Sequence, residues 1–152
     1  MGCEDNYYLA SNSDRPDWMR REALSNLVRD GCVEHLGKLV NNPDRPDWMR
    51  YGALEAICAY ACLGPSVTVR TSSISFGGQS LSMSSLSVDV SFLAPAAADF
   101  LIRLANNTDR PDRMRKAAVE ALVAGRWSKQ CLSIADNSDR PDWMRKMAMK
   151  GL

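Results

Sequence analysis

The chain has 152 residues, 45% apolar and 24% charged, which is typical of a soluble protein with its own hydrophobic core. Nineteen basic and eighteen acidic side chains leave a net charge of +1, which argues against the basic excess of nucleic-acid-binding domains. No apolar run reaches the roughly 18–20 residues of a membrane span, and Glu4 and Asp5 argue against a secretory signal peptide.

The cysteines are five in number and irregularly spaced, at positions 3, 32, 58, 62 and 131. This pattern predicts no disulfide framework and favours a reducing compartment, so we expect a cytoplasmic protein. Cys58 and Cys62 would share one face of a helix, but the only histidine, His35, completes no ligand set with them. We therefore expect these thiols to pack in the core and predict neither a metal nor a cofactor.

A nine-residue segment of the form NxDRPDxMR occurs four times. The copies span residues 12–20, 42–50, 107–115 and 137–145, so their starts lie 30, 65 and 30 residues apart. Repetition at a fixed period of this length is typical of solenoid proteins. The middle gap contains one repeat and about 35 additional residues.

Each copy predicts the start of a helix. Asp14 is expected to be the N-cap, with Pro16 in the first turn and Asp17 reaching back as in a capping box. Asp44 and its two later equivalents would do the same, each cap contributing about 1 kcal/mol. The spacing of apolar residues then predicts how far each helix runs, and Gly31 marks the end of the first of these helices. The predicted helices are 2–11, 14–29, 32–41, 44–63, 94–106, 109–125, 127–136 and 139–151.

These elements predict a mainly α protein: a short α-solenoid of about four 30-residue helical hairpins forming a single domain over residues 1–152. The stretches DRPDWMRREALSNL and DRPDRMRKAAVEALVAG resemble HEAT-like repeats of the short kind found in phycobilisome lyases. That resemblance implies stacked hairpins and a protein-binding role. Deoxyhypusine hydroxylase shares the repeat but uses His-Glu metal motifs, which this sequence lacks.

The repeated side chains suggest separate roles. The four methionines of the segments are expected in the core. Trp18, Trp48 and Trp143 become Arg113 in the third copy, and a position that accepts arginine keeps one edge in water. We therefore expect half-buried rings that either pack laterally between repeats or line an aromatic binding surface. The arginines of the segments are expected to form Asp–Arg ladders between neighbouring turns or to hold an anionic partner.

Residues 65–93 interrupt the repeats with a serine-rich stretch in which apolar residues alternate. A type II′ turn at Gly78-Gln79 would pair Phe76 with Leu81, Ile74 with Met83, Val69 with Val88 and Val67 with Val90. We therefore predict a β-hairpin insertion whose tip presents Ile74, Phe76, Leu81 and Met83 either to a partner or, folded back, to the helices. The stretch SISFGGQSLSMS resembles the arms of tailed-phage head-to-tail connectors.

The favoured function is a non-enzymatic protein-protein interaction or scaffold module that binds through a concave face or the hairpin arm. The alternative is a structural subunit of a ring or virion that exchanges the hairpin between protomers. A bilin lyase-like enzyme is the least favoured. The expected partner is a protein or a second copy, and a homo-oligomer fits the lack of a polar closing repeat near Leu152. Nucleic acid and membrane are not expected as partners, and a virion is the alternative location.

Overall fold

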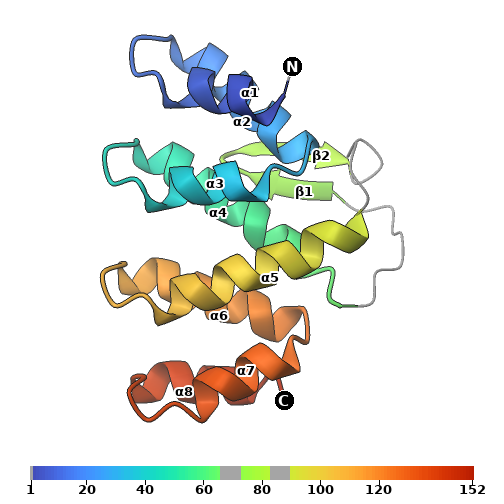
Figure 1. Ribbon diagram of the computed structural model, residues 1–152, viewed down its shortest axis with the longest axis vertical. Helices are drawn as coiled ribbons and strands as arrows, with labels where there is room; N and C mark the ends of the chain where they lie inside the picture. The colour runs from blue at the N-terminus through green and yellow to red at the C-terminus, as the bar shows by residue number, and fades with distance from the viewer. Residues whose placement is uncertain (1, 66–72, 83–89) are drawn as a thin grey trace. The chain divides into compact units, whose positions relative to one another are not determined.

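The computed structural model describes residues 2–65, 73–82 and 90–152 and is mainly helical, as predicted. Figure 1 shows the elements in chain order. They are α1 (Cys3–Ser11), α2 (Asp17–Arg29), α3 (Val33–Asn41), α4 (Asp47–Ala61), β1 (Ser73–Phe76), β2 (Gln79–Ser82), α5 (Val90–Asn106), α6 (Asp112–Ala124), α7 (Ser128–Ala135) and α8 (Asp142–Met149).

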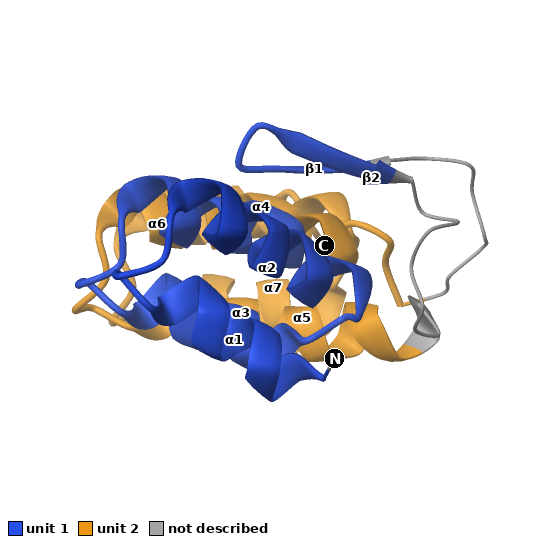
Figure 2. Ribbon diagram, turned by 90° about the horizontal axis from the view of Figure 1, so that it is seen from above, with its two compact units in different colours: residues 1–57, 69–89 blue, residues 58–68, 90–152 orange. Residues whose placement is uncertain are grey.

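The chain forms two compact units, coloured separately in Figure 2. Unit 1 contains residues 1–57 and 69–89, and unit 2 contains residues 58–68 and 90–152. Successive helices joined by a nine-residue segment form helical hairpins, which we number from one to four in chain order: α1–α2, α3–α4, α5–α6 and α7–α8. The single domain expected over the whole chain stays a prediction.

The core of each unit consists of apolar side chains at helical spacing. In unit 1 Leu24, Leu27 and Leu36 are fully buried, and in unit 2 Leu122 and Ile134 are fully buried. The repeated methionines follow the predicted pattern, since Met49, Met114 and Met144 are fully buried and Met19 is half-buried. Burial of aliphatic side chains is the main stabilising contribution to both units.

The second helix of each hairpin begins three residues later than predicted. The helix after the first segment starts at Asp17, and Pro16 is its N-cap, with φ −66° and ψ 153° and no side-chain cap bond. Pro111 and Pro141 precede α6 and α8 in the same way. The prediction that aspartate caps these helices is therefore wrong at Asp14, because the segment folds as a separate turn before the helix.

The β-hairpin exists, but its turn and register differ from the prediction. The turn is Gly77-Gly78, both with positive φ of 53° and 80°, a conformation that glycine adopts without strain. Phe76 therefore pairs with Gln79, and Ile74 pairs with Leu81. The predicted partner Met83 lies outside the described residues, as do Val67, Val69 and Val88, and Val90 begins α5 instead of pairing in a strand.

The β-hairpin packs against the helices of unit 1, on the side of α2 and α4 (Figure 2). Ile74 is 2% exposed and Phe76 is fully buried. The backbone N–H of Gly77 donates to Oε2 of Glu55 at 3.1 Å. Gly52 permits the close approach, because a Cβ there would lie 3.2 Å from the Gly77 Cα. The expectation that Ile74 and Phe76 present an exposed tip is thus wrong, and the fold-back alternative describes them.

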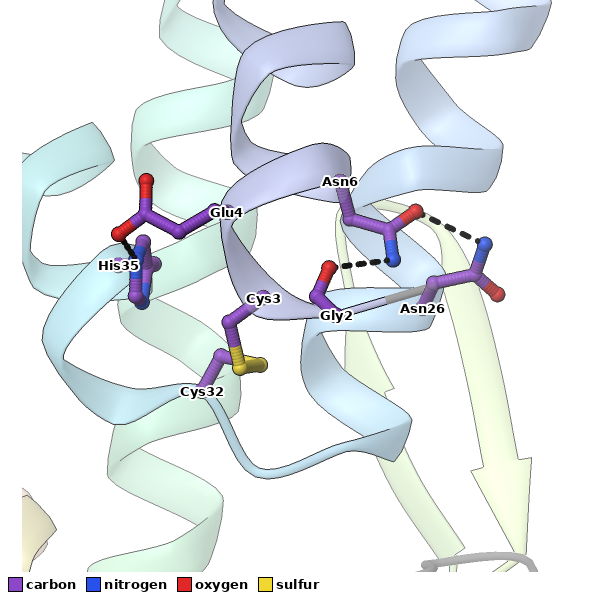
Figure 3. The surroundings of a disulfide bond; sticks show 7 residues. All are labelled: Gly2, Cys3, Glu4, Asn6, Asn26, Cys32 and His35. Carbon is purple, nitrogen blue, oxygen red and sulfur yellow. Dashed lines mark hydrogen bonds and ion pairs between the residues drawn. A yellow bond between two sulfur atoms is a disulfide. The ribbon is translucent and has the colours of Figure 1, made fainter.

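A disulfide joins the first and second helical hairpins, contrary to the prediction from the cysteine count. Cys3 at the start of α1 is bonded to Cys32, the N-cap of α3 (Figure 3). Their separation of 29 residues is close to one repeat period, so the two positions lie side by side when consecutive hairpins stack. Because disulfides are typical of oxidising compartments, the cytoplasmic expectation loses the support that it took from the cysteines.

Candidate interaction surface

The turn of each nine-residue segment is built by its asparagine. The side-chain Oδ1 accepts a hydrogen bond from the backbone N–H of the aspartate two residues later, and the asparagine carbonyl accepts one from the next arginine N–H. Such Asx turns order a loop without a helix cap. The side-chain bonds are 2.9–3.0 Å and join Asn12 to Asp14, Asn42 to Asp44, Asn107 to Asp109 and Asn137 to Asp139.

The last arginine of each segment closes its own helical hairpin. Its Nε donates to a backbone carbonyl near the C-terminus of the preceding helix, where carbonyls lack partners within the helix. A cation is also favourable at this end of a helix dipole. The four bonds measure 2.9–3.0 Å and run from Arg20 to Ala10, Arg50 to Val40, Arg115 to Ala105 and Arg145 to Ala135.

The first arginine of the segment makes the contact between consecutive hairpins. Nη1 of Arg45 donates to the carbonyl of Ser11, the last residue of α1. Nη1 of Arg140 donates at 3.0 Å to the carbonyl of Asn106, the last residue of α5. The same repeat position therefore joins hairpins 1 and 2 in unit 1 and hairpins 3 and 4 in unit 2.

These bonds correct the predicted Asp–Arg ladders. Arg45 and Arg140 bind backbone carbonyls of the neighbouring hairpin instead of aspartates of the neighbouring turn. Arg115 approaches an aspartate of its own segment, with Nη1 3.8 Å from Oδ1 of Asp112, which is largely exposed. The carbonyls at the ends of α1 and α5 lack partners within their helices and therefore accept these arginines, whereas the segment aspartates are exposed to solvent, where a surface ion pair contributes little.

The predicted row of aromatic residues has a different environment in each repeat. Trp18 is 68% exposed, whereas Trp48 and Trp143 are half-buried and Arg113 is exposed. The guanidinium carbon of Arg21, in the preceding hairpin, lies 4.2 Å from the centre of the Trp48 ring. This cation–π contact agrees with lateral packing between repeats at Trp48.

A second contact between hairpins 1 and 2 lies beside the disulfide. Nε2 of His35 is 2.9 Å from Oε1 of Glu4 (Figure 3). Tyr7 packs edge-on against His35 at 5.5 Å between ring centres and lies 5.6 Å from Nζ of Lys38. The hydrogen bond and the charge of His35 lower the pKa of the Glu4 carboxyl. The sole histidine thus takes part in packing between hairpins.

The remaining thiols lie in unit 2. The thiol of Cys58 is 3.7 Å from the carbonyl of Ala117, Cys62 is exposed, and Cys131 is buried. Desolvation raises the pKa of Cys62 and of Cys131. Among residues 2–65, 73–82 and 90–152, no three His, Cys, Asp or Glu side chains gather as a metal site. No helix in the same ranges has the length and apolar character of a membrane span.

Of the eight residues predicted for partner binding, the structure brings Ile74 and Phe76 together in the core of unit 1 and leaves Leu81 half-buried. The sequence prediction missed the role of the segment asparagines, the carbonyl-binding arginines and the disulfide. Periodicity could have found the disulfide, because residues about one period apart are neighbours in stacked hairpins. The acceptors of the arginine bonds are backbone carbonyls, so no second side chain in the sequence could have indicated these bonds.

Comparison of the chain with protein-family models, with curated proteins and with solved structures finds no match. The resemblance to HEAT-like repeats and the weaker one to phage connectors therefore stay expectations.

Proposed function

We propose that this chain is a non-enzymatic protein interaction or scaffold module in which four HEAT-like helical hairpins stack as a short solenoid. One observation carries the proposal. The arginine at the same repeat position joins consecutive hairpins in both units, Arg45 to Ser11 and Arg140 to Asn106. A contact made by the repeated segment itself supports stacking, and stacked hairpins provide extended surfaces suited to binding proteins.

The binding surface that we favour is formed in unit 2 by Arg113 and Trp143, near the starts of α6 and α8, and not by the β-hairpin. The burial of Ile74 and Phe76 removes the support for an arm that captures a partner, and with it the main support for a connector-like ring subunit. Arg113 is exposed and Trp143 keeps a half-exposed ring. Aromatic and arginine side chains are those most enriched at the energetic centres of protein interfaces.

Quantitative affinity capture with the purified chain tests this function. A captured protein must also bind in purified form at a fixed stoichiometry. We expect Arg113→Glu with Trp143→Ser to weaken that binding about tenfold or more. Phe92→Ser, which changes an apolar residue that is 73% exposed and lies outside the proposed binding surface, is the matched control. Capture of no protein, or equal binding by all three proteins, would contradict the proposal.

A further inference from the structure

The contacts between hairpins 1 and 2 come from fixed repeat positions. On one side stand Glu4, Tyr7, the carbonyl of Ser11, and Arg21 of hairpin 1. On the other stand His35, Lys38, Arg45 and Trp48 of hairpin 2. Because the segment starts lie 30, 65 and 30 residues apart, residues 125 apart occupy the same position in hairpins 1 and 4. Hairpin 4 therefore carries the positions that hairpin 1 uses in this contact, and hairpin 1 carries, on its other side, the positions that hairpin 2 uses.

One set lies on hairpin 1, where a preceding hairpin would pack; we call it the head face, formed by Asp5, Tyr8, Arg15 and Trp18. Trp18 is 68% exposed and Tyr8 is 61% exposed. Arg15 is exposed, whereas its equivalents Arg45 and Arg140 are half-buried. The head face therefore presents two large aromatic side chains and an arginine at positions that hairpin 2 uses to bind hairpin 1.

The other set lies on hairpin 4, where a following hairpin would pack; we call it the tail face. It is formed by Lys129, Leu132, the Asp136 carbonyl, Lys146, Met149 and Leu152. Leu132, Met149 and Leu152 are 55%, 62% and 56% exposed. The hairpin 1 equivalents of Met149 and Leu152 are Leu24 and Leu27, which are fully buried. Two core positions of the repeat are thus open to solvent on the tail face.

We propose that the tail face of one copy binds the head face of a second copy, repeating the contact that joins hairpins 1 and 2. This inference rests on the proposed stacking of hairpins. The register is fixed by the repeat. Lys146 would lie over the Trp18 ring as Arg21 lies over Trp48, and Arg15 would donate to the Asp136 carbonyl as Arg45 donates to that of Ser11.

The side chains at the remaining positions are complementary although their identities differ. Lys129 replaces Glu4 and Asp5 replaces His35, so the exposed pair at that position keeps opposite charges. Leu132 replaces Tyr7 and Tyr8 replaces Lys38, which converts a cation–π contact into an apolar one. Residues 1–30 carry six acidic and four basic side chains, and residues 126–152 carry three and six. Opposite net charges favour this orientation of encounter.

Such an interface is heterologous, since each copy contributes a different surface. A heterologous contact produces a closed ring or an open filament. It also allows a complementation experiment that an isologous dimer cannot pass. A copy with a damaged head and a copy with a damaged tail each retain one intact face, so a mixture forms one interface and stops at a dimer.

The experiment measures mass by light scattering and sedimentation over a range of concentrations. We expect the wild-type mass to rise with concentration, and the head variant Tyr8→Glu/Trp18→Glu and the tail variant Leu132→Glu/Met149→Glu each to remain monomeric. An equimolar mixture of the two variants should contain a 1:1 dimer. All substituted residues are exposed, so far-ultraviolet circular dichroism should be unchanged. Phe92→Glu is the control and should associate like the wild type.

Monomeric wild type at all concentrations would overturn the inference, as would variants that associate normally or a mixture without dimers. A monomeric chain that still captures another protein would leave the proposed function standing and refute only self-association. If that captured protein were lost on damaging either face, the face would belong to a different partner and not to a second copy. Self-association without any captured protein supports the present inference alone.

Discussion

Arg115 provides the sharpest test of how the repeat is held together. It is 6% exposed, and its Nε donates to the carbonyl of Ala105 at 2.9 Å. At the same helix end the carbonyl of Leu104 accepts from the Asn107 N–H, and that of Asn106 accepts from Arg140. The end of α5 is therefore satisfied largely by two arginines. Replacing Arg115 by methionine removes one of these donors and keeps an unbranched side chain of similar length.

The size of the effect follows from three contributions. A hydrogen bond from a charged donor contributes roughly 1.5–3 kcal/mol, and a cation at a helix C-terminus adds about 0.3–1 kcal/mol. Against these, Nη2 of Arg115 is buried with no hydrogen-bond partner among the described residues, so removing it returns part of a desolvation cost. We expect Arg115→Met to lower the free energy of unfolding by about 2 kcal/mol and the Tm by about 4–8 °C.

The measurement is urea unfolding followed by circular dichroism, with Lys116→Met as the matched control. Lys116 is the adjacent residue, carries the same charge and is exposed, so its replacement should change the free energy of unfolding by less than about 0.5 kcal/mol. Equal destabilisation by the two variants would show that net charge, and not the bond to Ala105, matters. No change in either variant would remove the carbonyl bond from the explanation of the fold.

Three further predictions concern the turn, the pair at His35 and the disulfide. Asn42→Ala should lower the free energy of unfolding by about 1 kcal/mol, because it removes the 2.9 Å hydrogen bond from the Asp44 N–H. Asp44→Ala should lower it clearly less. If thermal melts show Asp44→Ala to be the more destabilising variant, Asp44 is the helix cap after all. The pKa of Glu4 should lie below 4.5 in a carbon-detected NMR titration and should return toward 4.5 in His35→Gln. The stabilising contribution of Glu4 is therefore present above pH 4.5 and is lost as the pH falls through the lowered pKa. An unchanged titration in His35→Gln would contradict this. Cys3→Ser should lower the free energy of unfolding by about 3–4 kcal/mol under oxidising conditions and should leave it unchanged after reduction. The control is Cys62→Ser, at an exposed cysteine. Equal melting temperatures of the Cys3 and Cys62 variants would show that no disulfide forms.

Sequence periodicity was sufficient to predict the number and order of the helices in the part of the chain that the structure describes. The spacing of Leu24 and Leu27 relative to Met19 indicated one buried helix face, and the structure buries those leucines fully. The starts of the second helices were wrong by three residues because two conformations compete at the same segment. An aspartate cap and an asparagine turn both fit the letters Asn-x-Asp. The turn is formed because Pro16 is extended and is itself the N-cap of the helix that begins at Asp17.

The errors in the insertion had a similar origin. Alternation of apolar residues predicts a strand pair but leaves the turn open, because Gly77-Gly78 and Gly78-Gln79 are both acceptable two-residue turns. Moving the turn by one residue changes the partner of Phe76 from Leu81 to Gln79. Whether the apolar face of the β-hairpin is buried depends on the helix surface beside it. That surface includes Gly52, which permits the close approach of the β-hairpin but lies outside residues 65–93, so the inserted sequence alone could not indicate the burial.

The contact between hairpins also explains how a repeat protein can use one joint several times and still specify its neighbours. The bond from Arg45 ends on a backbone carbonyl, which every sequence offers, so it cannot distinguish one hairpin from another. Discrimination must come from the positions that vary, Glu4 with His35 inside the chain and Lys129 with Asp5 in the proposed assembly. Two head faces stacked on each other would bring together two first hairpins that each carry six acidic and four basic side chains, and like net charges disfavour that arrangement. The charges at these positions therefore direct hairpin 1 toward hairpin 4 of another copy.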